Sequence, residues 1–171
     1  MENTNKSLKE WNAIVEALGQ GLQTLIIRKY PTNSNGFLLS PTVSYALKDN
    51  YLINFKEQYR EFVQKNALPK KEGENTEIKY YAKIEAVLQK SAKKILTLDE
   101  YNIWDKNHVK YYLGNNKGYV WVLRVYKLDV PVMAEKNRGM LYANLKHKVS
   151  LQNAKPAITS ETFGKILNNL N

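Results

Sequence analysis

The strictest alternation of apolar and polar residues in this chain lies between Glu77 and Gln89. One face of that segment carries Ile78, Tyr80, Ala82, Ile84 and Ala86, and the other carries Glu77, Lys79, Tyr81, Lys83 and Glu85. Successive side chains of a β-strand point to opposite faces of the sheet. The segment therefore predicts a long antiparallel strand with one buried face and one solvated face.

A second strand is predicted at residues 118–128, where apolar side chains would cover both faces. A strand without a polar face belongs in the centre of a sheet, with helices over at least one side. Arg124 interrupts this apolar run, and an arginine that is buried without a partner is costly because it keeps its charge. Two kinds of partner fit, namely a phosphate or base edge of a ligand and a buried carboxylate. The candidate carboxylates are Glu77, Glu85 and Asp99.

The other elements are predicted from caps, turns and spacing. Ser7 and Glu10 have the spacing of a capping box, which predicts a helix over residues 8–18. Residues 23–30 and 37–40 are expected to form the two arms of a hairpin, because a turn-rich segment joins them. Further helices are predicted at 51–68, from Thr97 to Trp104, at 107–113 and in the C-terminal tail, and a further strand is predicted at 140–151.

These patterns favour an α+β fold with a twisted, mostly antiparallel sheet and helices packed on it. A chain of 171 residues suits one domain with a sizeable core. We expect a flexible N-terminus at residues 1–6, a single α+β domain at 7–158 and a short C-terminal helix at 159–171.

Composition narrows the class of protein. The chain has no cysteine, which excludes a disulfide framework and thiolate metal sites. No apolar run approaches the roughly 18 residues of a membrane span. The first residues also lack the basic and then apolar pattern of a signal peptide. We therefore expect a cytoplasmic protein that does not contact a membrane.

The charge is strongly and unevenly basic. The chain carries 26 Lys and Arg against 16 Asp and Glu, a net charge of +10. Between Lys106 and Lys155 there are ten basic residues and two acidic ones, Asp129 and Glu135, so a net +8 lies in that span. Such segregation favours a polyanionic partner, and nucleic acid in particular, over a surface that is merely solvated by lysine.

Basic residues alternate with aromatic residues on both predicted strands, as Lys79-Tyr81-Lys83 and as Arg124-Tyr126. Cations bind phosphates and aromatic rings stack on bases, so a sheet face of this kind suits nucleic acid. The competing interpretation is a solvated strand whose tyrosines pack beside lysine stems. The full set of candidate nucleic-acid contacts is Arg28, Lys29, Thr42, Lys79, Tyr81, Lys83, Arg124, Tyr126, Arg138, Lys146, His147 and Lys148.

Two smaller features belong to this hypothesis. Arg138 lies in an Asn-Arg-Gly turn that suits phosphate, although an ordinary hairpin turn explains the same residues. His147 lies between two lysines and is either a phosphate contact or a surface histidine. His108 is the only other histidine, and no third ligand stands at metal spacing, so neither a metal nor a cofactor is expected.

Two other functions remain as alternatives. A small Mg²⁺-dependent nuclease would use Glu77 and Lys79, which form a Glu-x-Lys pair on a predicted strand, but no well-placed aspartate precedes them. A protein-interaction module would use the basic face to bind an acidic partner. Because the sequence has no phosphate-binding glycine loop and no nucleophile motif, binding is favoured over catalysis.

Five short segments occur in an order and spacing that is specific as a set. They are Leu8-Lys9-Glu10-Trp11, Arg28-Lys29, Phe37-Leu38-Leu39-Ser40-Pro41-Thr42, Ile103-Trp104 and Leu123-Arg124-Val125-Tyr126. Together they resemble a prokaryotic family that is catalogued only as a domain of unknown function, over about residues 7–150. Two positions depart from that family, since Val43-Ser44-Tyr45 replaces an aromatic residue and a histidine, and Gly139-Met140-Leu141-Tyr142 replaces a tryptophan-bearing strand.

The resemblance implies a cellular setting. Similar domains are found fused or adjacent to Mrr-like restriction endonuclease domains, which implies a role in DNA restriction or antiviral defence. It implies DNA as a partner and a separate nuclease subunit as a second one. If the histidine after Pro41-Thr42 has a chemical role in the family, this chain lacks that role.

Overall fold

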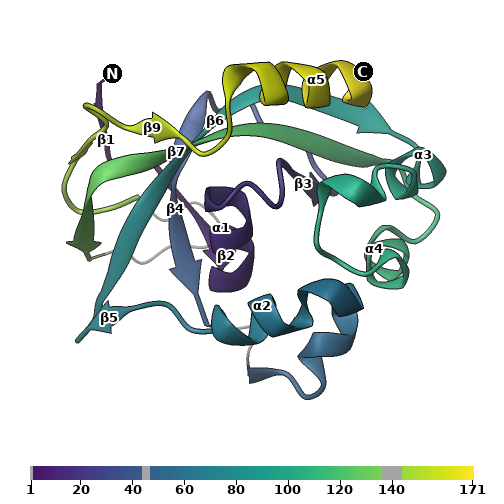
Figure 1. Ribbon diagram of the computed structural model, residues 1–171, viewed down its shortest axis with the longest axis horizontal. Coiled ribbons are helices and arrows are strands. Elements are labelled where there is room, and N and C mark those ends of the chain that lie inside the picture. Colours follow the sequence, from purple (N-terminus) through teal and green to yellow (C-terminus); the bar gives the residue numbers. More distant parts are fainter. Residues whose placement is uncertain (1, 44–46, 136–143) are drawn as a thin grey trace.

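The computed structural model describes residues 2–43, 47–135 and 144–171 of the chain (Figure 1). The described strands are β1 (Asn3–Thr4), β2 (Ser7–Trp11), β3 (Leu25–Arg28), β4 (Gly36–Thr42), β5 (Lys71–Glu72), β6 (Asn75–Lys90), β7 (Gly118–Ala134), β8 (Val149–Ser150) and β9 (Lys155–Pro156). The described α-helices are α1 (Asn12–Gly19), α2 (Arg60–Lys65), α3 (Ala92–Leu96), α4 (Lys106–Leu113) and α5 (Ser160–Leu170). Short 3₁₀ helices occur at Tyr51–Asn54, Glu57–Tyr59 and Asp99–Tyr101.

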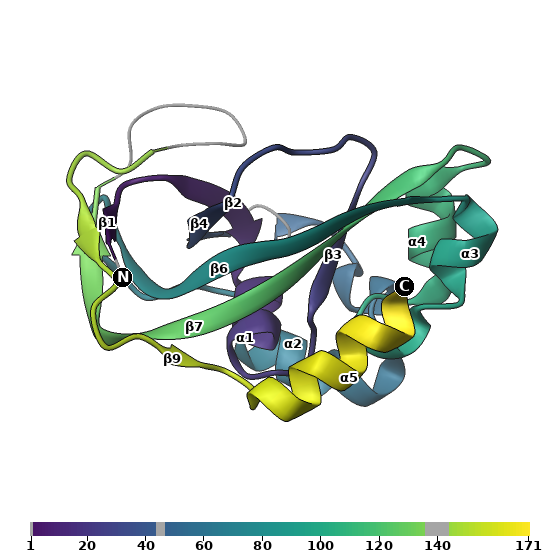
Figure 2. The same ribbon diagram turned by 90° about the horizontal axis from the view of Figure 1, so that it is seen from above.

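The main sheet has the strand order β2-β4-β6-β7-β3, with β5 added to β6 and β9 added to β7. Only β2 and β4 are parallel among the described pairs, and the others are antiparallel. The two long strands β6 and β7 cross the whole molecule side by side (Figure 2). The α+β fold with a mostly antiparallel sheet is therefore confirmed, as are the strand at 77–89 and the central strand at 118–128.

The sheet curls, so that its first and last strands approach each other. Register shifts between Ile78 and Tyr80 and between Ile84 and Ala86 interrupt the pairing of β6 with β7. Such irregularities bend a strand and increase its twist. The consequence is that β2 and β3, at opposite ends of the strand order, are linked by an ion pair between Glu10 and Arg28.

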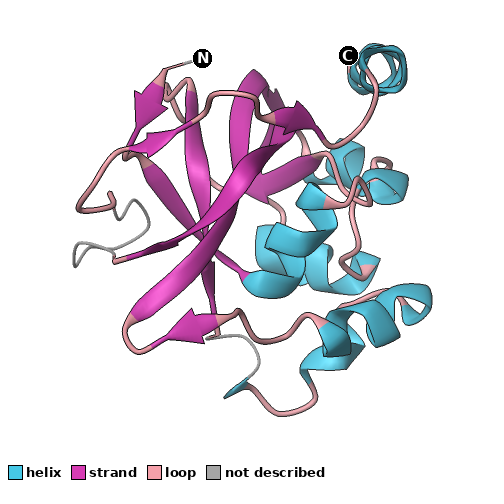
Figure 3. Cartoon of the chain, turned by 60° about the vertical axis from the view of Figure 1, so that its left-hand side comes forward, coloured by secondary structure: helices cyan, strands magenta, loops and turns pink. Residues whose placement is uncertain are grey.

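Helices cover both faces of the curled sheet. Helix α1 lies inside the curl, where Ile14 and Leu18 pack with Trp121 of β7. Helix α5 lies on the opposite face of β7, where Phe163 packs against Val122 (Figures 1 and 3). A third apolar cluster closes the end of the sheet beside β1 and β8. The burial of these apolar faces is the main stabilising contribution to the fold.

The predicted helix over residues 8–18 is wrong in its first turn, because residues Ser7–Trp11 form strand β2. The helix starts only at Asn12, and Ser7 does not cap it. Leu8 and Trp11 are buried in either conformation, so their spacing does not separate a helix from a strand. The parallel pairing with β4 decides the conformation, and local spacing carries no trace of a partner so distant in sequence.

The predicted hairpin of residues 23–30 and 37–40 is also wrong. Both segments are strands, but β3 pairs with β7 and β4 pairs with β2 and β6. The turn-rich segment between them therefore leads from β3, at one edge of the sheet, to β4, which lies next to β2 at the opposite edge. Turn residues predict where a chain bends, whereas the choice of strand partner depends on the whole sheet.

The predicted helices are confirmed in part. Helix α4 begins at an Asp105 cap, and α5 begins at a Thr159 cap whose hydroxyl accepts from the Thr162 amide at 3.1 Å. Thr97 ends α3 instead of starting a helix, since its hydroxyl donates to the Lys94 carbonyl at 2.6 Å. The helix predicted at 51–68 is broken into two 3₁₀ turns and α2.

Candidate functional site

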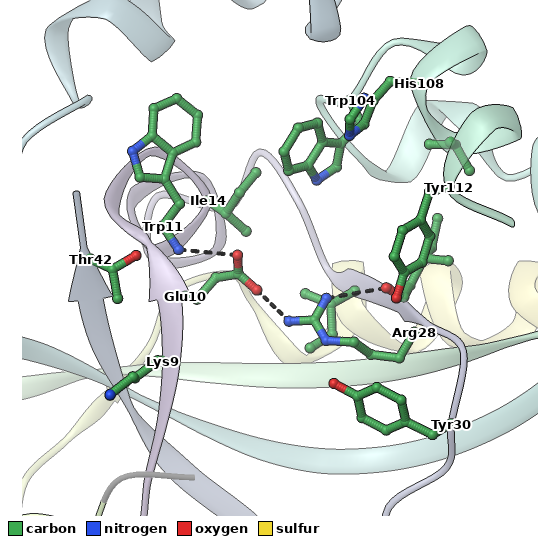
Figure 4. Close-up of a pocket in the computed structure, with 13 residues that line it drawn as sticks. Lys9, Glu10, Trp11, Ile14, Arg28, Tyr30, Thr42, Trp104, His108 and Tyr112 are labelled. Atoms are coloured by element: carbon green, nitrogen blue, oxygen red, sulfur yellow. Dashed lines mark hydrogen bonds and ion pairs between the residues drawn. The ribbon is translucent and has the colours of Figure 1, made fainter. Parts of the chain in front are cut away.

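A cavity of about 550 Å³ opens where the two end strands of the sheet, β2 and β3, approach each other. Residues from β2, α1, β3 and α4 line it, and so does the segment before α4. Its central lining residues are Glu10, Ile14, Arg28, Tyr30, Trp104 and Tyr112 (Figure 4). We call this space the seam cleft. Its size lies in the range of small-molecule and cofactor pockets.

An ion pair forms one wall of the seam cleft. The Arg28 guanidinium donates through Nη2 to Glu10 Oε2, and through Nη1 to the Ile27 carbonyl at 3.1 Å. The other carboxylate oxygen, Glu10 Oε1, accepts from the Trp11 amide at 3.1 Å. Both side chains are largely buried, at 16% exposed for Arg28 and 13% for Glu10. Two strands that share no backbone pairing are thus joined by charge.

The positive charge of Arg28 is stabilised by its partner. Burial alone would lower the pKa of Arg28, but Coulomb attraction to Glu10 and the hydrogen bond that Arg28 donates to Glu10 outweigh burial, so the pKa lies above its usual value. A guanidinium has five N–H groups, of which two are used by Glu10 and Ile27 in the described part of the chain. The guanidinium carbon also lies 5.8 Å from the centre of the Trp121 ring.

Aromatic rings form much of the rest of the wall. The Trp104 ring stacks on Phe55, at 4.3 Å between centroids, and on His108, at 4.6 Å. In Figure 4, Trp104 lies across the cleft from the Glu10–Arg28 pair, and Tyr112 flanks the guanidinium. The Lys29 ammonium lies 4.7 Å from the centre of the Tyr112 ring. The site therefore combines stacked rings, a carboxylate and several cations.

His108 is half-buried at the rim of this aromatic wall. Burial lowers its pKa, repulsion from Lys48 lowers it further, and Asp105 opposes both effects. The neutral imidazole, stacked on Trp104, is therefore the favoured form at neutral pH.

Three of the predicted contact residues gather at the seam cleft. Arg28 and Thr42 line it, and Lys29 lies beside its Tyr112 wall. Thr42 reaches this place because it ends β4 directly opposite Trp11 of β2. The cation Lys9, from β2, also lines the cleft.

Arg124 lies elsewhere and has a structural role. It is 6% exposed, and its guanidinium donates to the carbonyls of Ile158 and Thr159 at 3.1 and 3.4 Å and to the Ser160 hydroxyl at 3.3 Å. It also lies 4.8 Å from the centre of the Phe163 ring. The partners of Arg124 are therefore the start of α5 and its preceding turn, instead of the carboxylates or the phosphate that the sequence led us to expect.

On the predicted sheet face, Tyr81 and Lys83 of β6 lie directly opposite Tyr126 and Arg124 of β7, but the charges of Lys79 and Arg124 are engaged with other parts of the fold. Lys79 sits at a register shift of β6 and pairs with the buried Glu16 at 2.7 Å. Tyr81 packs so closely over Gly36 that a Cβ there would lie 2.2 Å from its hydroxyl. Burial raises the pKa of Tyr81. Lys83 is 55% exposed beside Glu85, and Tyr126 is half-buried where β9 pairs with β7.

The predicted basic residues after β7 lie at the far end of the sheet from α4. Lys146, His147 and Lys148 are exposed in a bend just before β8, which pairs with β1. Lys146 pairs with Glu135 at 2.7 Å. The strand predicted at 140–151 is present only as Val149–Ser150 in the described residues, and Arg138 lies outside them. Lys146 and Lys148 do not line the seam cleft.

The residues of the nuclease alternative are engaged with other partners. Glu77 pairs with Lys70 at 3.8 Å, while Lys79 pairs with Glu16. Among residues 2–43, 47–135 and 144–171, no three His, Asp or Glu side chains gather in a way that suits a metal ion.

Within the same residues, no helix has the length and apolar character needed to cross a membrane.

Sequence reasoning missed Glu10, Tyr112 and Trp104 as site residues. Glu10 matched a helix cap, Trp104 matched the buried face of a short helix, and Tyr112 was assigned only to a helix. One signal was present, because a strand that ends in Arg28-Lys29 leaves a cation at a sheet edge. The carboxylate that faces it came from a segment whose conformation was predicted wrongly.

Comparison with solved structures finds similar proteins of low sequence identity. Solved structures that are similar include three of the ASCH protein of Zymomonas mobilis. One variant form of it has 11% identity and a TM-score of 0.49, covering 99% of each chain. A second variant has 13% identity and a TM-score of 0.47, covering 75% of this chain and 74% of that chain. The unaltered form has 13% identity and a TM-score of 0.46, covering 95% and 93%.

No curated protein matches the sequence. Residues 7–169 match the family described as "Domain of unknown function (DUF1802)". That match covers nearly the whole chain and agrees with the resemblance that the sequence segments indicated. The chain therefore belongs to the DUF1802 family.

Proposed function

We propose that this protein binds nucleic acid, DNA in the first place, and that the seam cleft is its recognition site. The observation that carries the proposal is the Glu10–Arg28 pair, which stands among aromatic rings in a chain of net charge +10. Cations supply the salt-sensitive attraction to phosphates, and aromatic rings supply stacking surfaces for bases.

The arrangement of charge around the cleft supports this proposal. Lys9 lines the cleft, Lys29 lies against its Tyr112 wall, and Lys48 is close enough to influence His108. A strand whose base enters the cleft would keep its phosphates at the rim, where lysines contact them best.

We further propose that the protein acts in a restriction or defence system, recognising DNA or presenting it to a separate nuclease. The support is the resemblance to domains that occur beside Mrr-like endonuclease domains. The protein itself is proposed as the binding component and not as the nuclease, because Glu77 and Lys79 are each paired with another residue.

The test is fluorescence anisotropy with labelled single-stranded and double-stranded DNA and matched RNA, at several salt concentrations. Binding should weaken with salt by a log–log slope of about 0.9 for each duplex phosphate contacted, or about 0.7 for a single strand. Arg28→Ala should weaken binding at least about tenfold. Lys165→Ala, which removes one exposed charge from α5, is the matched control and should have little effect.

Failure to bind any DNA or RNA at low salt would overturn the proposal. Equal losses for the Arg28 and Lys165 variants would show that charge alone attracts nucleic acid and that the cleft is not the site. Co-purification with an acidic protein, unchanged by nuclease treatment, would instead favour a protein-interaction module.

A further inference from the structure

We propose that the seam cleft recognises one unpaired guanine, with Glu10 accepting from the base N–H groups and Arg28 donating to the base carbonyl. This inference rests on the nucleic-acid-binding function proposed above and names the base that the same site takes.

The first step concerns what can enter. The cleft is narrow enough to be lined at once by α1, β3 and α4, and its wall bears both an ion pair and stacked rings. A base whose hydrogen-bonding edge is to meet that pair cannot be paired with another base. The ligand is therefore a base in a single strand or one that is extruded from a duplex.

The second step concerns the acceptors. Each Glu10 oxygen already accepts one bond, from Arg28 or from the Trp11 amide, and a carboxylate oxygen can accept a second. The two oxygens thus offer neighbouring acceptors to a ligand. Guanine presents two neighbouring N–H donors on its pairing edge, at N1 and at the 2-amino group. Adenine and cytosine present an acceptor beside their amino group, and thymine and uracil present one N–H between two carbonyls.

The third step concerns the donor. The guanine carbonyl at C6 follows directly after its N1–H, so a complete match needs a donor next to the carboxylate. The ion pair places the Arg28 guanidinium there, and this guanidinium has N–H groups that Glu10 and Ile27 do not use in the described residues. Because Glu10 and Arg28 fix each other, the donor and acceptors are already positioned before the ligand arrives.

The fourth step concerns the faces of the base. Trp104 lies across the cleft from the pair, but its ring already stacks on Phe55 and on His108, so it closes the cleft without offering a free face (Figure 4). Tyr112 flanks the pair and is the ring that would lie beside a bound base. Lys29, against the Tyr112 ring, supplies a cation where the strand leaves the cleft. Stacking alone tolerates every base, so the selectivity comes from Glu10 and Arg28.

The test measures the anisotropy of a labelled oligothymidine that carries one central guanine, adenine, cytosine or hypoxanthine. Hypoxanthine keeps the carbonyl and the N1–H of guanine but lacks the 2-amino group. We expect the guanine strand to bind about tenfold or more tighter than the adenine and cytosine strands, with hypoxanthine in between. This comparison needs no altered protein and is therefore independent of any effect on folding.

The matched variants are Glu10→Gln at the cleft and Glu161→Gln at an exposed position on α5. Both remove one negative charge, so general attraction to the strand should be kept or slightly raised in each. Only Glu10→Gln should abolish the preference for guanine, because an amide offers one acceptor instead of two.

Equal, salt-sensitive binding of all four strands would overturn the guanine assignment and leave nucleic-acid binding standing. A preference for another base, or a guanine preference that survives Glu10→Gln in a folded protein, would also overturn it. Absence of binding to every strand would overturn both this inference and the proposed function.

Discussion

Two arginines interrupt apolar strands in this protein, and the structure uses them in opposite ways. Arg124 lies in the middle of β7 and gives its N–H groups to the carbonyls and the hydroxyl at the start of α5. Arg28 ends β3 and pairs with a carboxylate at the wall of an open cleft. In the first case the partner is backbone that belongs to the fold. In the second case, N–H groups that Glu10 and Ile27 do not use remain for the proposed ligand.

The comparison shows why a charged residue in a buried strand does not by itself indicate a binding site. A buried guanidinium must have partners, and carbonyl oxygens at the end of a chain turn satisfy it as well as a carboxylate does. What separates Arg28 from Arg124 is the cavity beside it and the aromatic residues that share that cavity.

The largest effect is expected at Arg124. The change Arg124→Ala leaves the carbonyls of Ile158 and Thr159 without their donor and removes the contact with Phe163. We expect the free energy of unfolding, measured with urea, to fall by about 3 kcal/mol. The affinity of the folded variant for DNA should stay unchanged. A loss of affinity without a loss of stability would reverse the roles of the two arginines.

The second effect concerns Arg28. The change Arg28→Ala leaves the Glu10 carboxylate without its partner and should lower the free energy of unfolding by about 1–2 kcal/mol, since the pair is only partly exposed. Adding Glu10→Ala should recover part of that stability, because no buried charge is then left alone. The affinity for DNA should stay weakened in both variants. A double variant that regains binding would contradict the site.

The third effect compares two neighbouring tyrosines on α4. Tyr112 lines the cleft, whereas Tyr111 is 87% exposed. The change Tyr112→Ala removes a ring from beside the bound base and should weaken single-strand binding by about 1 kcal/mol. The change Tyr111→Ala serves as the control and should leave the anisotropy titration unchanged. If both variants lose affinity equally, α4 contacts nucleic acid over its outer surface and not through the cleft.

The smallest effect is the pH dependence of the free energy of unfolding, which is expected from His108 at the cleft and not from the exposed His147. Burial lowers the pKa of His108 below the value of 6.5 that the unfolded chain retains. The unfolded state therefore takes up a proton first as the pH falls, so the free energy of unfolding should decrease below about pH 6.5. The change His108→Phe keeps the stack on Trp104 and should remove this part of the decrease. The change His147→Gln, at an exposed position, should leave the decrease in place.

The long strands could be predicted from the sequence, and the partners of the short ones could not. Alternation over residues 77–89 and the apolar run at 118–128 are properties of the segments themselves, and both are strands. Strand β2 exists because β4 lies beside it, and β3 pairs with residues Tyr119–Val122 of β7. No local pattern carries those pairings, because the paired segments lie far apart in the sequence.

The same limit applies to the site. Arg28, Lys29 and Thr42 were predicted because each stands at the end of a strand or beside a turn. Glu10 was missed because its segment was predicted as a helix, and Tyr112 because a tyrosine in an amphipathic helix usually packs in a core. Lys79 and Arg124 were predicted as contacts because they alternate with tyrosines on predicted strands, but Lys79 pairs with the buried Glu16 and Arg124 donates to the turn before α5.

In a fully closed β-barrel every strand is joined to its neighbours by backbone hydrogen bonds. In this curled sheet the end strands β2 and β3 are joined by the Glu10–Arg28 ion pair instead. The backbone hydrogen bonds between buried strands are already shielded from water, whereas the attraction between the partly exposed charges of Glu10 and Arg28 grows when a ligand displaces water. A ligand that displaces water from the seam cleft therefore also strengthens the ion pair that joins β2 to β3. The affinity for the ligand and the rigidity of the sheet are thus coupled through the same two side chains, Glu10 and Arg28.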